Sequence, residues 1–215
     1  MITSVQLQNF KNHRSTNISL GRINVLVGPN ASGKTSVLQA LHTEHRCRSD
    51  LNVKYFKISN QILAQPSYTE KYPPYLQSDG GYLASVLAHL IIYAPEKFQN
   101  LLSLIQRIIP AIHHIRVRPA HIRPQEQYMI EFNNPSLTIS DEREAIGHEL
   151  IFDMLNGNDI PAHSIGEGIL AVLCILTMVI DTESPTLILL DDIEQNIHPW
   201  AQRTLMDILK ELLER

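Results

Sequence analysis

The stretch Gly28-Pro29-Asn30-Ala31-Ser32-Gly33-Lys34-Thr35 decides how this sequence folds, because it matches the pattern G-x-x-x-x-G-K-[ST] at every fixed position. Its two glycines allow a tight backbone turn in which successive N–H groups face inward around phosphate groups. A helix that starts near Lys34 brings the positive end of its dipole to the same place. The stretch therefore predicts a phosphate-binding loop, or P-loop.

Each residue around this loop has an expected contact. The Lys34 ammonium is expected to reach the β- and γ-phosphates, and the Thr35 hydroxyl is expected to bind magnesium. The cofactors that the loop predicts are ATP and Mg²⁺. The predicted nucleotide-binding residues are Asn30, Ala31, Ser32, Gly33, Lys34, Thr35 and Ser36.

The sequence on either side supports this interpretation. The apolar run Ile23 to Val27 predicts a buried strand that ends at the loop, and the spacing from Lys34 to about His45 predicts a helix. Residues 2 to 8 alternate between apolar and polar and predict a first strand, while residues 18 to 20 predict a short second one.

Two acidic residues follow another apolar run, Thr186 to Leu190. Ligands of α/β proteins bind at the carboxyl ends of parallel strands, which is where this run would deliver Asp191 and Asp192. Asp191 is expected to hold the magnesium, directly or through water, and Asp192 to polarise the attacking water. The alternative is a solvated strand end without a function.

Alternating strands and helices predict an α/β fold, with a P-loop NTPase sheet flanked by helices. The whole chain, 1–215, is expected to be one domain, with its core in residues 1–45 and 160–215 and a strand-rich, helical subdomain inserted at 46–159. Further elements are expected at 53–58, 82–94, 96–109, 112–117, 128–132, 149–154, 167–180 and 200–214.

Composition narrows the class of protein. With 44% apolar and 19% charged residues the chain is globular, and its net charge of -4 argues against a protein that coats nucleic acid. The N-terminus lacks a secretory signal, and the longest apolar run, 169–180, is too short to span a membrane. We therefore expect no membrane association. Cys47 and Cys174 fit no disulfide or metal spacing, which predicts a reducing, cytoplasmic location.

The turn Ser164-Ile165-Gly166-Glu167-Gly168 precedes an apolar helix and the acidic strand. This order resembles the ABC-type ATPases, in which such a signature turn touches the γ-phosphate held by the opposite subunit. The resemblance implies that role for Ser164, Gly166, Glu167 and Gly168. An ordinary helix N-cap is the alternative.

Three segments resemble more closely the ABC branch that contains RecF, Rad50, SMC and the OLD-type ATPases: Val5 to His13, Ile23 to Leu41, and Asp191 to Pro199 with Glu194, Asn196, His198 and Pro199. Residues 79–87 resemble the same group more weakly. The resemblance implies that Lys11 and Asn12 touch the nucleotide. It also implies a magnesium-sensing glutamine, for which Gln61, Gln65 and Gln77 are candidates.

The sequence departs from that family in three ways. Asp192 stands where the family has glutamate, and Ile193 stands where it has proline. The shorter carboxylate predicts slow hydrolysis or none. The sequence ends at Arg215, before the strand that presents a histidine to the γ-phosphate, a role that His198 does not simply fill. It also leaves no room for a Toprim nuclease domain, so nuclease activity is not predicted.

One basic cluster stands out, and it has two interpretations: contact with nucleic-acid phosphates or an acidic partner, or a strand with a solvated face. Its members are His113, His114, His121, Arg116, Arg118 and Arg123.

Three functions remain open from the sequence. The first is an ATPase switch, in which ATP closes a homodimer or larger oligomer and drives a protein effector in DNA repair or phage defence. The second is a non-hydrolysing ATP-binding regulatory or structural subunit. The third is a small-molecule kinase, in which the signature turn and residues 196–199 would have no role.

Overall fold

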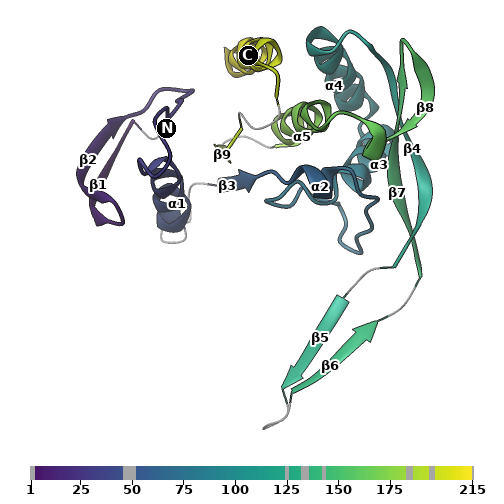
Figure 1. The fold of residues 1–215 in the computed structure, drawn as a ribbon, viewed down its shortest axis with the longest axis horizontal. Helices are drawn as coiled ribbons and strands as arrows, with labels where there is room; N and C mark the ends of the chain where they lie inside the picture. Colours follow the sequence, from purple (N-terminus) through teal and green to yellow (C-terminus); the bar gives the residue numbers. More distant parts are fainter. Residues whose placement is uncertain are drawn as a thin grey trace.

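The computed structural model describes residues 3–45, 52–123, 126–131, 136–141, 144–182, 186–193 and 197–214. It is a mixed α/β structure in which most of the helices lie between two groups of strands at opposite sides of the molecule (Figure 1). Within these residues, none of the helices combines the length and the apolar character needed to cross a membrane.

The elements follow one another in a mixed order. The strands are β1 (Ser4–Phe10), β2 (His13–Ser19), β3 (Asn52–Lys57), β4 (Ile112–Ile122), β5 (Glu126–Glu131), β6 (Ser136–Asp141), β7 (Ala145–Met154), β8 (Gly157–Pro161) and β9 (Thr186–Asp191). The helices are α1 (Lys34–His45), α2 (Asn60–Leu63), α3 (Leu83–Tyr93), α4 (Pro95–Ile108), η1 (Ala162–Ser164), α5 (Glu167–Asp181) and α6 (Pro199–Glu214).

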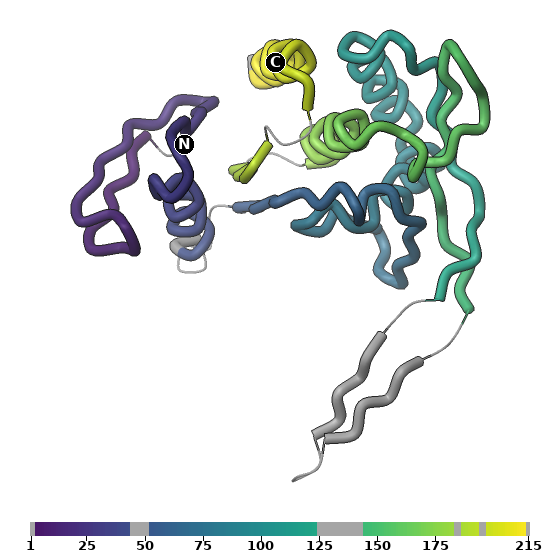
Figure 2. The backbone as a smooth tube through the Cα atoms, viewed as in Figure 1, coloured from purple at the N-terminus to yellow at the C-terminus, as the bar shows by residue number. Residues whose placement is uncertain are grey.

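The N-terminal part is a hairpin packed on one helix. Strands β1 and β2 pair in antiparallel fashion, and Leu7 is buried against Val37 and Ala40 of α1. The three elements lie together at one side of the molecule, in purple to dark blue (Figure 2). The predicted first strand and the helix from Lys34 are confirmed, while the second strand, predicted only at 18–20, is longer and begins at His13. This packing sets the hairpin beside the P-loop.

The prediction of a buried strand at Ile23 to Val27 is wrong. This segment belongs to none of the strands assigned among the described residues, and none of those strands pairs with it. Val25 is 65% exposed and Val27 is 90% exposed. An apolar run becomes a buried strand only when neighbouring strands supply hydrogen bonds and helices or another sheet cover both faces, and here neither condition is met.

The acidic strand lies in a parallel pair. Strand β9 pairs with β3 in a register that sets Lys57 opposite Asp191 and Tyr55 opposite Leu189. Helix α1 packs against both strands. A parallel pair with a helix against it, preceded in sequence by the P-loop, is the arrangement expected of a P-loop NTPase fold.

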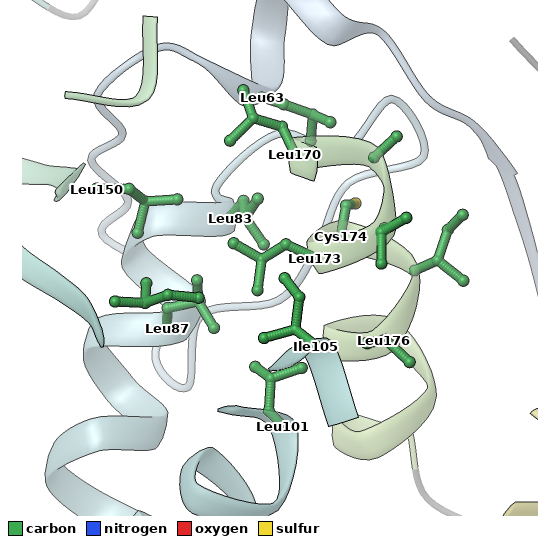
Figure 3. Close-up of a cluster of buried hydrophobic side chains, with 14 of the residues drawn as sticks. Leu63, Leu83, Leu87, Leu101, Ile105, Leu150, Leu170, Leu173, Cys174 and Leu176 are labelled. Carbon is green, nitrogen blue, oxygen red and sulfur yellow. The ribbon is translucent and has the colours of Figure 1, made fainter. Parts of the chain in front are cut away.

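Helix α5 runs through the main hydrophobic core. Every residue from Leu170 to Met178 is buried, as the continuous apolar sequence predicts for a helix covered on all sides. The one polar side chain in this stretch, Thr177, has a hydrogen-bond partner within the helix, because its hydroxyl donates to the Leu173 carbonyl at 2.7 Å. Figure 3 shows Leu173 and Cys174 of α5 among side chains from α3 and α4, such as Leu87 and Ile105.

The middle of the chain supplies the rest of this core. Helix α4 is buried along one stripe that includes Leu101 and Ile105, and Pro95 stands in its first turn, where its missing N–H is not needed. The antiparallel sheet β4-β7-β8 packs against α3 and α4. The predicted division into a core and an insertion at 46–159 stays a prediction; β3, which lies within that range, pairs with β9.

Candidate functional site

The P-loop has the backbone that its glycines predict. Gly33 has a φ of +96°, in the region that side chains rarely adopt, and a Cβ there would lie 2.6 Å from His13 Nε2. At Gly28 a Cβ would lie 2.9 Å from Ser32 Oγ. The positive φ therefore favours glycine at Gly33, whereas at Gly28 only the rotatable Ser32 hydroxyl would have to move. The loop borders an open hollow of about 430 Å³.

Lys34 folds back over its own loop. Its ammonium donates to the carbonyls of Gly28 at 2.8 Å and Pro29 at 3.0 Å. Carbonyl oxygens are modest partners for an ammonium compared with phosphate oxygens, which carry full charge. The lysine is therefore held at the loop by contacts that an anion can replace.

The turn between β1 and β2 lies against the P-loop. Asn12 Nδ2 donates to the Ala31 carbonyl at 3.2 Å, and Lys11 Nζ hydrogen-bonds Gln39 Oε1 on α1. The structure thus places Lys11 and Asn12 beside the loop, while the contact with the nucleotide that the family resemblance implies stays a prediction. It adds His13, whose Nε2 lies 3.2 Å from the Gly33 carbonyl. In the sequence, His13 was indicated only as the last residue of the segment Val5 to His13 that resembles the family.

The P-loop meets the acidic strand at one hydrogen bond. Thr35 Oγ1 donates to Asp191 Oδ1 at 3.1 Å, although the two residues are 156 positions apart. Asp191 is only 7% exposed. A hydroxyl and a carboxylate that converge in this way are the oxygen ligands that Mg²⁺ prefers. The residues present therefore fit a magnesium ion beside a phosphate loop.

Asp191 has a second hydroxyl partner that the sequence did not indicate. Tyr55 Oη donates to Asp191 Oδ2 at 2.9 Å. Burial raises the pKa of Tyr55, and with the hydrogen bond to Asp191 it reaches about 12. Tyr55 belongs to no recognised motif, and only the β3–β9 register brings it to the acid.

Asp192 is ion-paired. Its Oδ2 lies 3.0 Å from Lys57 Nζ, on a backbone with a φ of +56°, which aspartate tolerates better than most residues. The hydrogen bond to Asp192 raises the pKa of Lys57. Lys57 is 59% exposed, so water screens much of this attraction. Lys57, like Tyr55, was missed by the sequence reading.

The signature turn lies at the N-terminal end of α5. Ser164 ends η1, Gly166 precedes the helix, and Glu167 and Gly168 form its first turn. Gly166 is exposed, and a Cβ placed there would meet nothing within 4 Å. Packing therefore does not require a glycine at this position. Glu167 accepts a hydrogen bond from Asn60 at 3.2 Å.

Of the three glutamine candidates, Gln61 lies in α2 and Gln65 lies just after it. Gln77 lies in a loop whose Ser78 carbonyl accepts from the Lys57 N–H at 2.8 Å. None of them is assigned the magnesium-sensing role by these contacts. Of the predicted stretch after Asp191, Glu194 and Asn196 lie outside the described residues.

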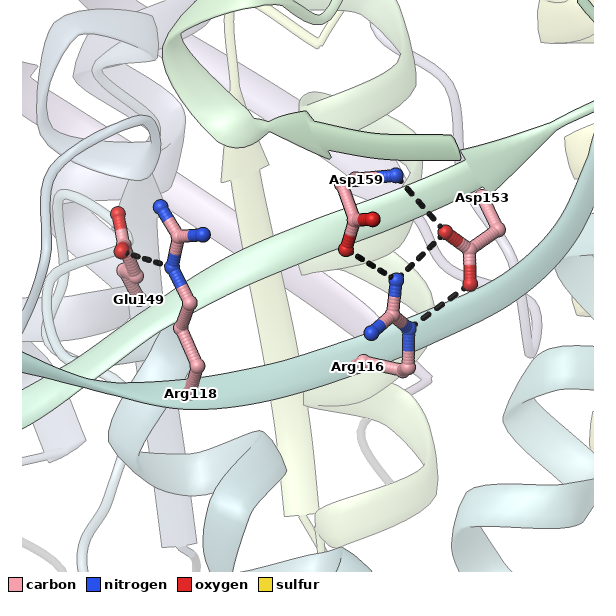
Figure 4. Close-up of polar contacts among 5 residues, drawn as sticks. All are labelled: Arg116, Arg118, Glu149, Asp153 and Asp159. Atoms are coloured by element: carbon pink, nitrogen blue, oxygen red, sulfur yellow. Dashed lines mark hydrogen bonds and ion pairs between the residues drawn. The ribbon is translucent and has the colours of Figure 1, made fainter. Parts of the chain in front are cut away.

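The arginines of the basic cluster are paired with acids. On β4, Arg116 contacts both Asp153 and Asp159 at 2.7 Å, and Arg118 pairs with Glu149 directly across the sheet (Figure 4). Just after β4, Arg123 forms an ion pair with Glu144 at 3.1 Å. The hydrogen bonds from Arg116 hold the pKa of Asp153 down at about 2. These pairs favour a solvated strand face over a nucleic-acid surface.

Comparisons with known proteins agree with the geometry. A family model described as "AAA domain, putative AbiEii toxin, Type IV TA system" matches residues 48–215, and one described as "AAA ATPase domain" matches residues 1–72. A 42-residue stretch is 52% identical to the DNA double-strand break repair Rad50 ATPase of Methanopyrus kandleri. That match covers 19% of this chain and 5% of the relative's length. No solved structure matches the chain.

The first of these models spans most of the sequence, from β3 to the last helix, and so includes the acidic strand and the signature turn. The second covers the P-loop itself. The chain therefore belongs to the family of AAA domains described as putative AbiEii toxin, Type IV TA system, and it is a P-loop ATPase of the RecF, Rad50 and SMC class.

Proposed function

We propose that this chain binds Mg–ATP on its P-loop and uses the nucleotide as a switch that brings two copies together. The observation that carries the proposal is the Thr35–Asp191 hydrogen bond of 3.1 Å, because it joins the phosphate loop to a buried acid at a strand end. Their convergence is what a metal–phosphate site requires.

The residues around the loop take distinct roles. Bound Mg²⁺ would neutralise charge on the phosphates, and Thr35 and Asp191 would hold it. Lys34 would exchange its two loop carbonyls for phosphate oxygens. The backbone of residues 30–36 would donate to the phosphates, with Lys11 and Asn12 at the edge of the site.

Hydrolysis would depend on Asp192. Its carboxylate would polarise water, but it is one methylene shorter than a glutamate and it is paired with Lys57. Both features predict slow turnover. They also favour the second candidate function, a regulatory subunit in which ATP binding orders a partner interface without being hydrolysed.

The switch would close through the signature turn. Ser164, Gly166 and Glu167 are exposed at the N-terminal end of α5, where a helix favours negative charge. A second copy could bring its bound γ-phosphate to this turn, and the first copy would do the same in return. The product is a head-to-tail dimer with two nucleotides at its interface.

The setting of the switch rests on resemblance and on the descriptions of the matched proteins. The family description refers to a putative toxin of a Type IV TA system, and the matched Rad50 ATPase is named for DNA double-strand break repair. We propose an OLD-like ATPase that acts on a partner effector in the cytoplasm, in phage defence or DNA repair.

Calorimetry with Mg–ATP tests the binding step. The wild-type chain is expected to bind, and Lys34→Ala is expected to weaken binding by about 10- to 150-fold, since a charge-assisted contact with phosphate contributes about 1.5–3 kcal/mol. Unchanged binding by Lys34→Ala would overturn the proposed site. Light scattering with and without Mg–ATP tests the dimer, which should form only with nucleotide.

Phosphate release separates the two candidate functions. A slow rate in the wild type that rises in Asp192→Glu supports the ATPase switch, because the longer side chain restores the reach to water. Tight Mg–ATP binding without turnover in either protein supports the regulatory subunit.

A further inference from the structure

Asp191 is held from both sides. Thr35 Oγ1 donates to its Oδ1 at 3.1 Å and Tyr55 Oη donates to its Oδ2 at 2.9 Å. The terminal torsion of an aspartate is soft, so one hydrogen bond leaves the plane of the carboxylate free to turn. Two donors on opposite oxygens fix that plane.

Tyr55 is itself held in place by its surroundings. It lies on β3 between α1 and β9, both of which pack against that strand. Its ring lies 5.7 Å from the ring of His42, at 45°, and His42 belongs to the helix that begins with Lys34 and Thr35. One side chain therefore spans the P-loop helix and the acidic strand.

The two hydroxyls differ in what a cation would do to them. Thr35 is a predicted metal ligand. Its hydrogen bond to Asp191 Oδ1 would therefore break when Thr35 Oγ1 and Asp191 Oδ1 both bind the ion. The bond from Tyr55 uses the other oxygen and need not break. Residues that hydrogen-bond a metal ligand commonly orient that ligand, and mutation of such a residue costs about 10–100-fold in metal affinity.

We propose that Tyr55 is a positioning residue that holds the Asp191 carboxylate in the orientation that binds Mg²⁺ together with the nucleotide. The inference rests on the proposed function and names a residue of the same site. It predicts that Tyr55 affects the metal-dependent part of ATP binding and leaves the metal-independent part unchanged.

The test is the ratio of the Kd for ATP in EDTA to the Kd for ATP in Mg²⁺, measured by calorimetry. Tyr55→Phe keeps the ring and its contact with His42 and removes only the hydroxyl. Its Kd in EDTA should match the wild type, while the ratio should fall about 10-fold or more. The matched control is Tyr75→Phe, which removes a surface hydroxyl that accepts from Lys71 at 3.0 Å. Its ratio should not change.

A double-mutant cycle separates positioning from a general structural role. In an Asp191→Asn background the metal-binding carboxylate is already lost, so Tyr55→Phe should not lower the ratio further. An unchanged ratio in Tyr55→Phe, an equal loss of affinity in EDTA and in Mg²⁺, or an additive effect in the cycle overturns the inference and leaves the proposed function standing. Absence of Mg–ATP binding by the wild type overturns the proposed function, and the inference with it.

Discussion

Thr35 and Asp191 are joined by a hydrogen bond of 3.1 Å across 156 positions of sequence. Thr35 stands in the first turn of α1 and Asp191 is the last residue of β9. The contact is the point at which the phosphate loop and the acidic strand become one site.

Removal of the Thr35 hydroxyl should weaken Mg–ATP binding by at least about 10-fold, because a metal ligand is lost while the backbone of the loop stays in place. Calorimetry on Thr35→Ala measures the change. The control is Thr43→Ala on the same helix, whose hydroxyl donates to the Gln39 carbonyl at 2.9 Å and lies away from the loop. Equal affinities for the two variants would contradict the assignment.

Gly33→Ala should destabilise the loop. The residue has a φ of +96°, and its new Cβ would lie 2.6 Å from His13 Nε2, so both the backbone and the histidine must shift. We expect a loss of about 1–2 kcal/mol in the free energy of unfolding, together with weaker ATP binding. Gly157→Ala is the comparison, since its nearest contact would be an ordinary 3.5 Å from Ile160. Thermal unfolding should show a lower Tm for Gly33→Ala alone.

Lys57→Met should raise the rate of phosphate release. The Lys57 ammonium occupies Asp192 Oδ2 at 3.0 Å, and methionine, which has a similar length but no charge, leaves that oxygen free to contact the attacking water. Lys57 is largely exposed, so the gain is limited to about 5-fold, which corresponds to an ion pair of about 1 kcal/mol. The control is Lys54→Met on the same strand, which loses a contact with Thr182. A slower rate in Lys57→Met would mean that the lysine assists the nucleotide instead.

Acid should destabilise the β4–β7 sheet through Asp153. Its pKa is lowered from 3.8 to about 2 by the hydrogen bonds from Arg116, so its contribution to stability is complete above pH 3.8 and is lost as the pH falls through 2. In Arg116→Met the pKa of Asp153 should return toward 3.8. The urea midpoint of this variant should therefore depend less on pH between 3.8 and about 2 than that of the wild type. Lys210→Met, which removes an exposed pair with Asp207, should keep the wild-type dependence.

Leu173→Ala should cost about 2–5 kcal/mol of the free energy of unfolding, because the side chain is fully buried in the main core and leaves a cavity. Urea denaturation measures the loss. Leu155→Ala, at a position that is 63% exposed, should change the midpoint little. A similar loss in both variants would mean that α5 does not form the centre of the core.

Much of the local structure could be predicted from the sequence. Helix α1 begins at Lys34 as expected, and the break expected at Pro95 is found, with α4 beginning at that residue just after α3 ends at Tyr93. Such features depend on the backbone preferences of a few neighbouring residues, on the missing N–H of proline and on apolar periodicity. A short window of sequence contains all of them.

Ile23 to Val27 shows where such a window fails. Its apolar pattern predicts a buried strand, yet Val27 is 90% exposed and no described strand pairs with the segment. Burial of a strand depends on neighbours from elsewhere in the chain, and five residues carry no information about whether those neighbours are present.

By itself, the sequence determined the phosphate loop and the acids Asp191 and Asp192, because each is a run of adjacent residues whose chemistry follows from residue type and spacing. Only the tertiary structure brought Tyr55 and Lys57 to those acids. The physical reason is strand register: a shift of one residue between β3 and β9 would turn both side chains to the opposite face, and no local pattern specifies that alignment.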